Sequence, residues 1–109
     1  MANFITAINC IEGRVQEPLR KYLTERYPEE FVDMITIPGP DKQLSENMPD
    51  SMDNYVRDTL RFTIANRQTN RVAIAGHFDC LGNPVSPEIH IKQIGEAVQR
   101  IQSWVPELK

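Results

Sequence analysis

Short apolar runs alternate with amphipathic stretches along this chain. Three runs are mostly apolar and have the length of buried strands: residues 3–9, 31–37 and 71–76. Between and after these runs, apolar side chains recur at helical spacing in three longer segments: residues 15–27, 52–66 and 87–104. The pattern therefore predicts the order strand, helix, strand, helix, strand, helix.

The residues at the ends of the helical segments support these boundaries. Pro28 ends the first helix, and Ser51 can cap the second. Ser86 followed by Pro87 is a strong start for the third helix, because Ser can cap and Pro suits the first helical position. Pro106 is expected to end that helix.

The predicted order of elements defines the fold class. Strands and helices that alternate through right-handed crossovers give an α/β fold, here a small parallel sheet of about three to four strands with helices on both faces. We expect the first strand at the centre, with the second and third on either side. At 109 residues the chain is expected to form a single domain, residues 1–109.

Composition and charge narrow the classes of function. A hydrophobic content of 40% and a charged content of 25% are ordinary for a soluble globular protein. The net charge of -3, with basic residues interleaved among acids, gives no support to nucleic-acid binding. No apolar stretch approaches the roughly 20 residues that span a bilayer, and the first four residues do not resemble a signal peptide. We expect a cytoplasmic protein without a membrane partner, in which thiols stay reduced.

Candidate chemistry gathers where two predicted strands end. Cys10 directly follows the first strand, and His77 and Cys80 follow the third; the chain has no other cysteine. The carboxyl ends of parallel strands share one edge of the sheet, where ligands collect. Two thiolates and one imidazole are typical zinc ligands, and three protein ligands leave the open position of a catalytic zinc site. The sequence therefore predicts Zn²⁺ bound by these three residues.

Other interpretations of the same residues are available. The cysteines could be small buried hydrophobes, and His77 an ordinary loop histidine. A phosphatase loop requires five residues between its Cys and Arg, which Cys10 and Arg14 do not have, and there is no Cys-x-x-Cys redox motif. The convergence of three ligand types on one edge favours zinc.

Glu12 and Arg14 lie just beyond the first strand. A guanidinium beside a carboxylate keeps it ionised and fixes its direction. Near a metal, such a pair can orient a reacting water molecule; elsewhere it is a surface ion pair of little energetic value.

Two motifs together resemble a known family. Residues 10–14, Cys-Ile-Glu-Gly-Arg, and residues 76–80, Gly-His-Phe-Asp-Cys, are similar to the paired motifs of the β-class carbonic anhydrases, Cys-x-Asp-x-Arg and Gly-His-x-x-Cys. The resemblance extends from about residue 3 to residue 105 in the same order of elements, with Glu12 in place of the usual Asp.

The resemblance implies a function and roles for the residues. Cys10, His77 and Cys80 would bind zinc, and Glu12 with Arg14 would form the catalytic carboxylate–arginine dyad. The implied enzyme is a lyase that hydrates carbon dioxide reversibly to bicarbonate through zinc-bound hydroxide. Relatives with the same zinc motif hydrolyse carbon disulfide or carbonyl sulfide. The family builds its active sites at dimer interfaces, so we expect a homodimer or higher oligomer.

A second hypothesis keeps the same ligands but not the catalysis. In a regulatory or interaction module that binds zinc, Glu12 or Asp79 would close the fourth position. Two further features have open roles. His90, expected in the first turn of the last helix, either shuttles protons or is simply exposed. The polar residues 41–50, expected to be a loop, either cover the site or are plain surface.

Overall fold

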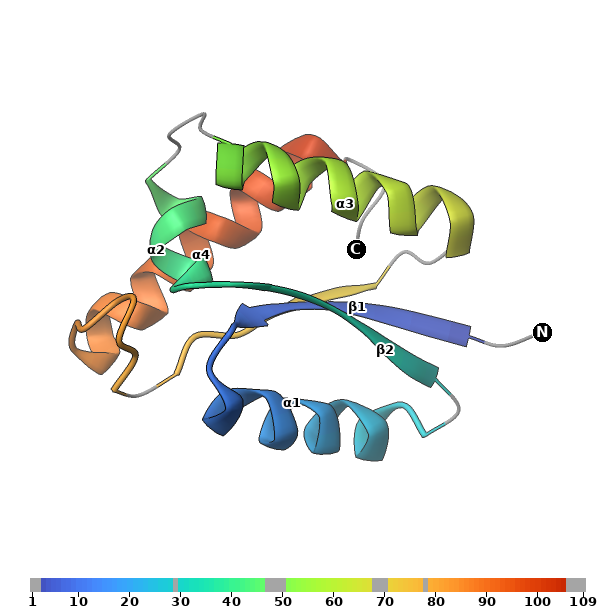
Figure 1. Cartoon of the computed structure of the whole chain (residues 1–109), viewed down its shortest axis with the longest axis horizontal. Coiled ribbons are helices and arrows are strands. Elements are labelled where there is room, and N and C mark those ends of the chain that lie inside the picture. The colour runs from blue at the N-terminus through green and yellow to red at the C-terminus, as the bar shows by residue number, and fades with distance from the viewer. Residues whose placement is uncertain (1–2, 29, 47–50, 68–70, 78, 106–109) are drawn as a thin grey trace.

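The computed structural model describes residues 3–28, 30–46, 51–67, 71–77 and 79–105 (Figure 1). These residues form three strands and four helices, which run in the order β1 (Asn3–Cys10), α1 (Gly13–Arg26), β2 (Glu30–Ile37), α2 (Pro40–Ser45), α3 (Ser51–Arg67), β3 (Val72–Ile74) and α4 (Pro87–Trp104). The predicted α/β class is confirmed. None of the helices in the described ranges has the length and apolar character needed to cross a membrane.

The sheet has β1 at its centre, as predicted. Its order is β2-β1-β3, and both pairs of neighbours are parallel. β2 pairs along the whole of β1, which brings Cys10 opposite Ile37. Its shorter neighbour β3 pairs with residues 6–8 of β1. The residues that come directly after each of the three strands therefore lie at the same edge of the sheet.

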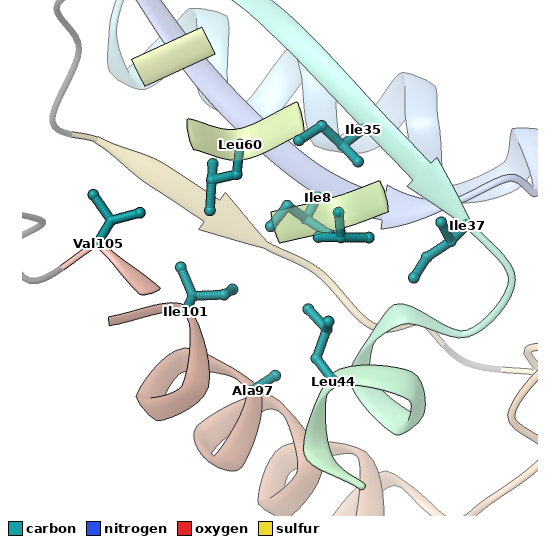
Figure 2. Packing of buried hydrophobic residues seen from close by; sticks show 9 residues of the cluster. Ile8, Ile35, Ile37, Leu44, Leu60, Ala97, Ile101 and Val105 are labelled. Atoms are coloured by element: carbon teal, nitrogen blue, oxygen red, sulfur yellow. The ribbon is translucent and has the colours of Figure 1, made fainter. Parts of the chain in front are cut away.

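Helices cover both faces of the sheet because side chains of the central strand alternate between them. Ile5 and Ala7 pack with Leu23 of α1 on one face. Ile8 points to the opposite face, where α2, α3 and α4 lie (Figure 1). Figure 2 shows the core on this side, which contains Ile8, Ile35, Ile37, Leu44, Val56, Leu60, Ala97, Ile101 and Val105.

The ends of the last two helices test the predicted boundaries. Ser86 is the N-cap of α4, and its Oγ accepts a hydrogen bond from the Ile89 amide at 3.4 Å. Ser51 is the first residue of α3 rather than the residue before it. Pro106, the expected end of the last helix, lies outside the described residues, and α4 ends at Trp104.

The prediction of a loop at residues 41–50 is wrong for residues 41–45. Residues 40–45 form α2, with Pro40 in its first turn and Gly39 as its N-cap. Asp41 and Leu44 are buried in this helix, so it belongs to the core layer. Residues 47–50 lie outside the described part of the chain. A single apolar side chain in a six-residue helix gives no helical periodicity, which explains the incorrect prediction.

Candidate metal centre

The neighbouring strands β1 and β3 lead to the three predicted metal ligands and bring them close together. Cys10 is the last residue of β1. Beyond β3, the Ala75 amide still donates to the Ile8 carbonyl at 3.0 Å, which keeps the chain alongside β1 as it approaches His77. Asp79 then takes a positive φ of 58°, and the backbone turns so that Cys80 faces back toward Cys10, with 3.8 Å between the two Sγ atoms.

The ligand atoms lie at distances that suit a single metal ion. One atom each from Cys10, His77 and Cys80 lie within 4.8 Å of one another. A tetrahedral zinc with Zn–S bonds of about 2.3 Å places two sulfurs about 3.8 Å apart, which matches the Sγ–Sγ distance of 3.8 Å. Both cysteines are free thiols, 3% and 2% exposed. The residues present therefore fit zinc in both geometry and donor chemistry.

The two thiols have different electrostatic surroundings. Burial alone would raise the pKa of Cys10, but hydrogen bonds from the Gly39 amide, from His77 and from the Glu12 amide outweigh it and hold the pKa below that of a free thiol. Burial and the neighbouring Cys10 raise the pKa of Cys80, although backbone amides oppose this. Cys10 is therefore the thiol that ionises first.

Arg14 connects the two segments that carry the ligands. Its Nε donates to Glu12 Oε1, and its Nη2 donates to the Asp79 carbonyl at 3.2 Å. Its Nη1 also lies 3.4 Å from Asp79 Oδ2. The other Glu12 oxygen, Oε2, is 3.3 Å from His77 Nε2. Among the described residues, the ligand group includes no carboxylate: it consists of the two thiols and the imidazole.

A cavity of about 690 Å³ borders this centre. Its lining includes both cysteines and the charged side chains of Glu12, Arg14 and Asp79. The apolar part of the lining consists of Ile11, Pro38, Leu81 and Pro84. A small molecule in this cavity would therefore lie beside the thiol pair, against a wall that is partly apolar and partly charged.

His90 is neither exposed nor part of the cavity lining. It is 7% exposed, and its Nδ1 lies 2.5 Å from Asp41 Oδ2. The expectation of a solvent-exposed histidine is wrong, because the first turn of α4 packs against α2. None of the described residues 41–46 lines the cavity either, so this part of the segment 41–50 does not cover the centre.

Two residues that support the centre were not predicted. Gln16 Nε2 donates to the Cys10 carbonyl at 3.0 Å, and the Gly39 amide bonds to the Cys10 sulfur. Gly39 has a φ of 51°, which an L side chain rarely adopts. Its position between Pro38 and Pro40 is a signal of unusual backbone in the sequence.

The fold and the centre define a class of protein: a small α/β domain with a cluster of two thiols and an imidazole at the carboxyl edge of a parallel sheet. A family model described as "Putative carbonic anhydrase" matches residues 1–109. The chain therefore belongs to this carbonic anhydrase family, which confirms the resemblance seen in its motifs. Comparisons with curated proteins and with solved structures gave no match.

Proposed function

We propose that this protein is a zinc-dependent carbonic anhydrase that interconverts carbon dioxide and bicarbonate. The observation that carries the proposal is the arrangement of Cys10, His77 and Cys80, at distances that suit one zinc, beside a cavity. When bound, zinc supplies a Lewis acid that lowers the pKa of a coordinated water molecule. Membership of the carbonic anhydrase family supports the same reaction.

The chain contributes orientation and charge to this reaction. Arg14 holds Glu12 through Oε1, while Oε2 lies 3.3 Å from His77 Nε2, at the ligand group. In the proposal, Glu12 Oε2 accepts a hydrogen bond from the reacting water and so fixes the direction of its lone pair. Glu12 also raises the pKa of Arg14 through their hydrogen bond, and a guanidinium is charged at every pH where the enzyme works even without this shift.

A catalytic role is favoured over a zinc module without turnover. The module requires a fourth protein ligand from Glu12 or Asp79. Both carboxylates contact Arg14, and neither belongs to the ligand group among the described residues. An open fourth position is characteristic of catalytic zinc sites.

The substrate class is a small, linear, uncharged molecule. Apolar lining from Ile11 and Leu81 suits such a molecule, and Arg14 suits an anionic product. Carbon disulfide and carbonyl sulfide share this shape and are the alternative substrates. We further propose that the protein acts in the cytoplasm, where both free thiols stay available to the metal, and as a homodimer.

The test is a comparison of metal content and turnover in the same preparation. Wild-type protein purified without chelator should contain about one zinc per chain and should hydrate carbon dioxide faster than it hydrolyses carbon disulfide or carbonyl sulfide. Cys80→Ser should lose most of the zinc, since a hydroxyl does not ionise near neutral pH. Leu81→Ala, at the exposed neighbouring position, is the matched control and should keep the metal. Wild-type protein that neither contains nor takes up zinc would contradict the proposal.

A further inference from the structure

A group of buried polar side chains lies behind the metal centre, between α2 and α4. Asp41 is 1% exposed and Asn83 is fully buried; His90 is 7% exposed. Burial of a charged carboxylate and two polar side chains costs free energy unless they are bonded to one another. We call Asp41, Asn83, His90 and Gln93 the Asp41 network.

Hydrogen bonds join the network at one carboxylate. Asp41 Oδ2 is 2.5 Å from His90 Nδ1, and its Oδ1 accepts from Asn83 Nδ2 at 3.1 Å. Asn83 Nδ2 also donates to Gln93 Oε1 at 2.7 Å. The network therefore connects the first turn of α2, the first two turns of α4 and the loop that follows Cys80.

The Asp41 carboxylate packs directly against the segment that carries His77. A Cβ atom on Gly76 would lie 2.7 Å from Asp41 Oδ2, so any side chain at this position would force the carboxylate to shift. Glycine lets the backbone pass the carboxylate without such a shift. Gly76 immediately precedes His77. The position of Asp41 therefore constrains the backbone of His77, and with it the position of the imidazole.

The same carboxylate fixes the two loops whose amides bond to the thiols. The Gly39 amide donates to Cys10, and the amides of Gly82 and Asn83 donate to Cys80. These loops touch backbone to backbone, since a Cβ on Gly39 would lie 2.9 Å from the Gly82 carbonyl oxygen. The bond from Asn83 Nδ2 to Asp41 Oδ1 joins the two loops through side chains.

We propose that Asp41 is the positioning residue of the metal centre: through Asn83, Gly76 and the loop at Gly39, it holds all three ligand-bearing segments in register for one ion. The proposal rests on the proposed zinc site and adds a residue that touches neither metal nor substrate. It predicts that loss of the Asp41–Asn83 bond changes metal affinity and ligand geometry in a protein that remains folded. Groups hydrogen-bonded directly to metal ligands typically change metal affinity by about 10- to 100-fold. Asp41 positions such groups, the amides of Gly39 and Asn83, so we expect its loss to have an effect in the same range.

The test uses cobalt(II) as a spectroscopic probe for the metal. Asp41→Asn removes the charge at nearly constant shape, and Asn83→Ala removes the bond between the loops without changing any charge. Both should bind cobalt about 10- to 100-fold more weakly than wild type, with shifted thiolate-to-cobalt charge-transfer and d–d bands. Circular dichroism and thermal unfolding should show that each variant is folded at the temperature of the titration.

The matched control is Asp53→Asn. Asp53 is another buried carboxylate, 2% exposed, and it also joins α2 to α4, through Gln43 at 3.1 Å and Arg100 at 2.5 Å. A merely structural role for Asp41 predicts that both carboxylates behave alike. The positioning role predicts that Asp53→Asn lowers stability but keeps the wild-type cobalt affinity and spectrum.

The outcomes separate this inference from the proposed function. Wild-type affinity and spectrum in both Asp41→Asn and Asn83→Ala would overturn the positioning role, as would equal losses in Asp53→Asn. If Asp41→Asn does not fold, Asn83→Ala decides by the same criteria. A wild-type protein that binds neither cobalt nor zinc would overturn the metal centre itself, and the inference with it.

Discussion

Metal binding at this centre should release protons, and Cys80 should release more than Cys10. The pKa of Cys80 is raised by burial and by its neighbour Cys10, so this thiol carries its proton at pH 7 in the metal-free protein. Burial acts on Cys10 in the same direction, but hydrogen bonds from Gly39 and His77 lower its pKa below that of a free thiol. A metal binds the thiolate form of both residues, so their protons must leave.

The number of protons released sets how steeply the metal affinity depends on pH. Cys80 contributes about one proton, and Cys10 contributes up to one more, so apparent affinity should rise about 10- to 100-fold for each pH unit near neutrality. The sign is fixed by the same argument: affinity is lost as pH falls. A range of about pH 7 to 8 keeps the measurement above the ordinary pKa of an imidazole, about 6.5.

Calorimetric titration with zinc in two buffers of different ionisation enthalpy gives the number of protons released. A chelator of known affinity brings the binding into the measurable range. Cys80→Ser, titrated directly with enough zinc to overcome its weaker binding, should release about one proton fewer per bound zinc than wild type, because a serine hydroxyl has no proton to lose at this pH. Zinc binding that releases no proton, or a count that is the same in Cys80→Ser, would refute the assignment of thiolate ligands.

Three further predictions concern the dyad, the core and the assembly. Arg14→Ala should keep zinc but lose carbon dioxide hydration, because Glu12 is then free to move onto the metal; wild-type turnover would remove the dyad from the mechanism. Leu60→Ala should cost about 2–5 kcal/mol in urea unfolding, since Leu60 is fully buried; Phe62→Ala, at an exposed position of the same helix, should cost less than about 0.5 kcal/mol. Sedimentation at micromolar concentration should show a dimer, since the sheet leaves β2 and β3 as open edges; a monomer would contradict this.

The apolar pattern of the sequence alone predicts the sheet and the three residues that meet at its edge. Ile5 and Ile8 belong to a nearly unbroken apolar run, which is typical of a strand buried on both faces. Once the strands were known, the shared edge of a parallel sheet brought Cys10 close to His77 and Cys80. Sequence alone could therefore predict which residues meet, although it gave no distances.

The supporting residues could not be predicted, because burial of polar groups leaves no mark in an apolar pattern. Asp41 and His90 look like surface residues in the sequence, and only tertiary packing buries them against each other. The reverse error affects Tyr22 and Tyr55, which follow the helical spacing of apolar side chains in the segments 15–27 and 52–66 but are exposed. Helical spacing identifies a face of a helix but does not show how far the core extends across it.

Stopped-flow measurement of carbon dioxide hydration tests the central claim most directly. The protein is compared after zinc loading and after zinc removal, at a series of pH values. The account predicts catalysis that requires zinc and that rises with pH through an ionisation near neutrality. Protein with about one zinc per chain and no catalysis at any pH up to about 9 would contradict it.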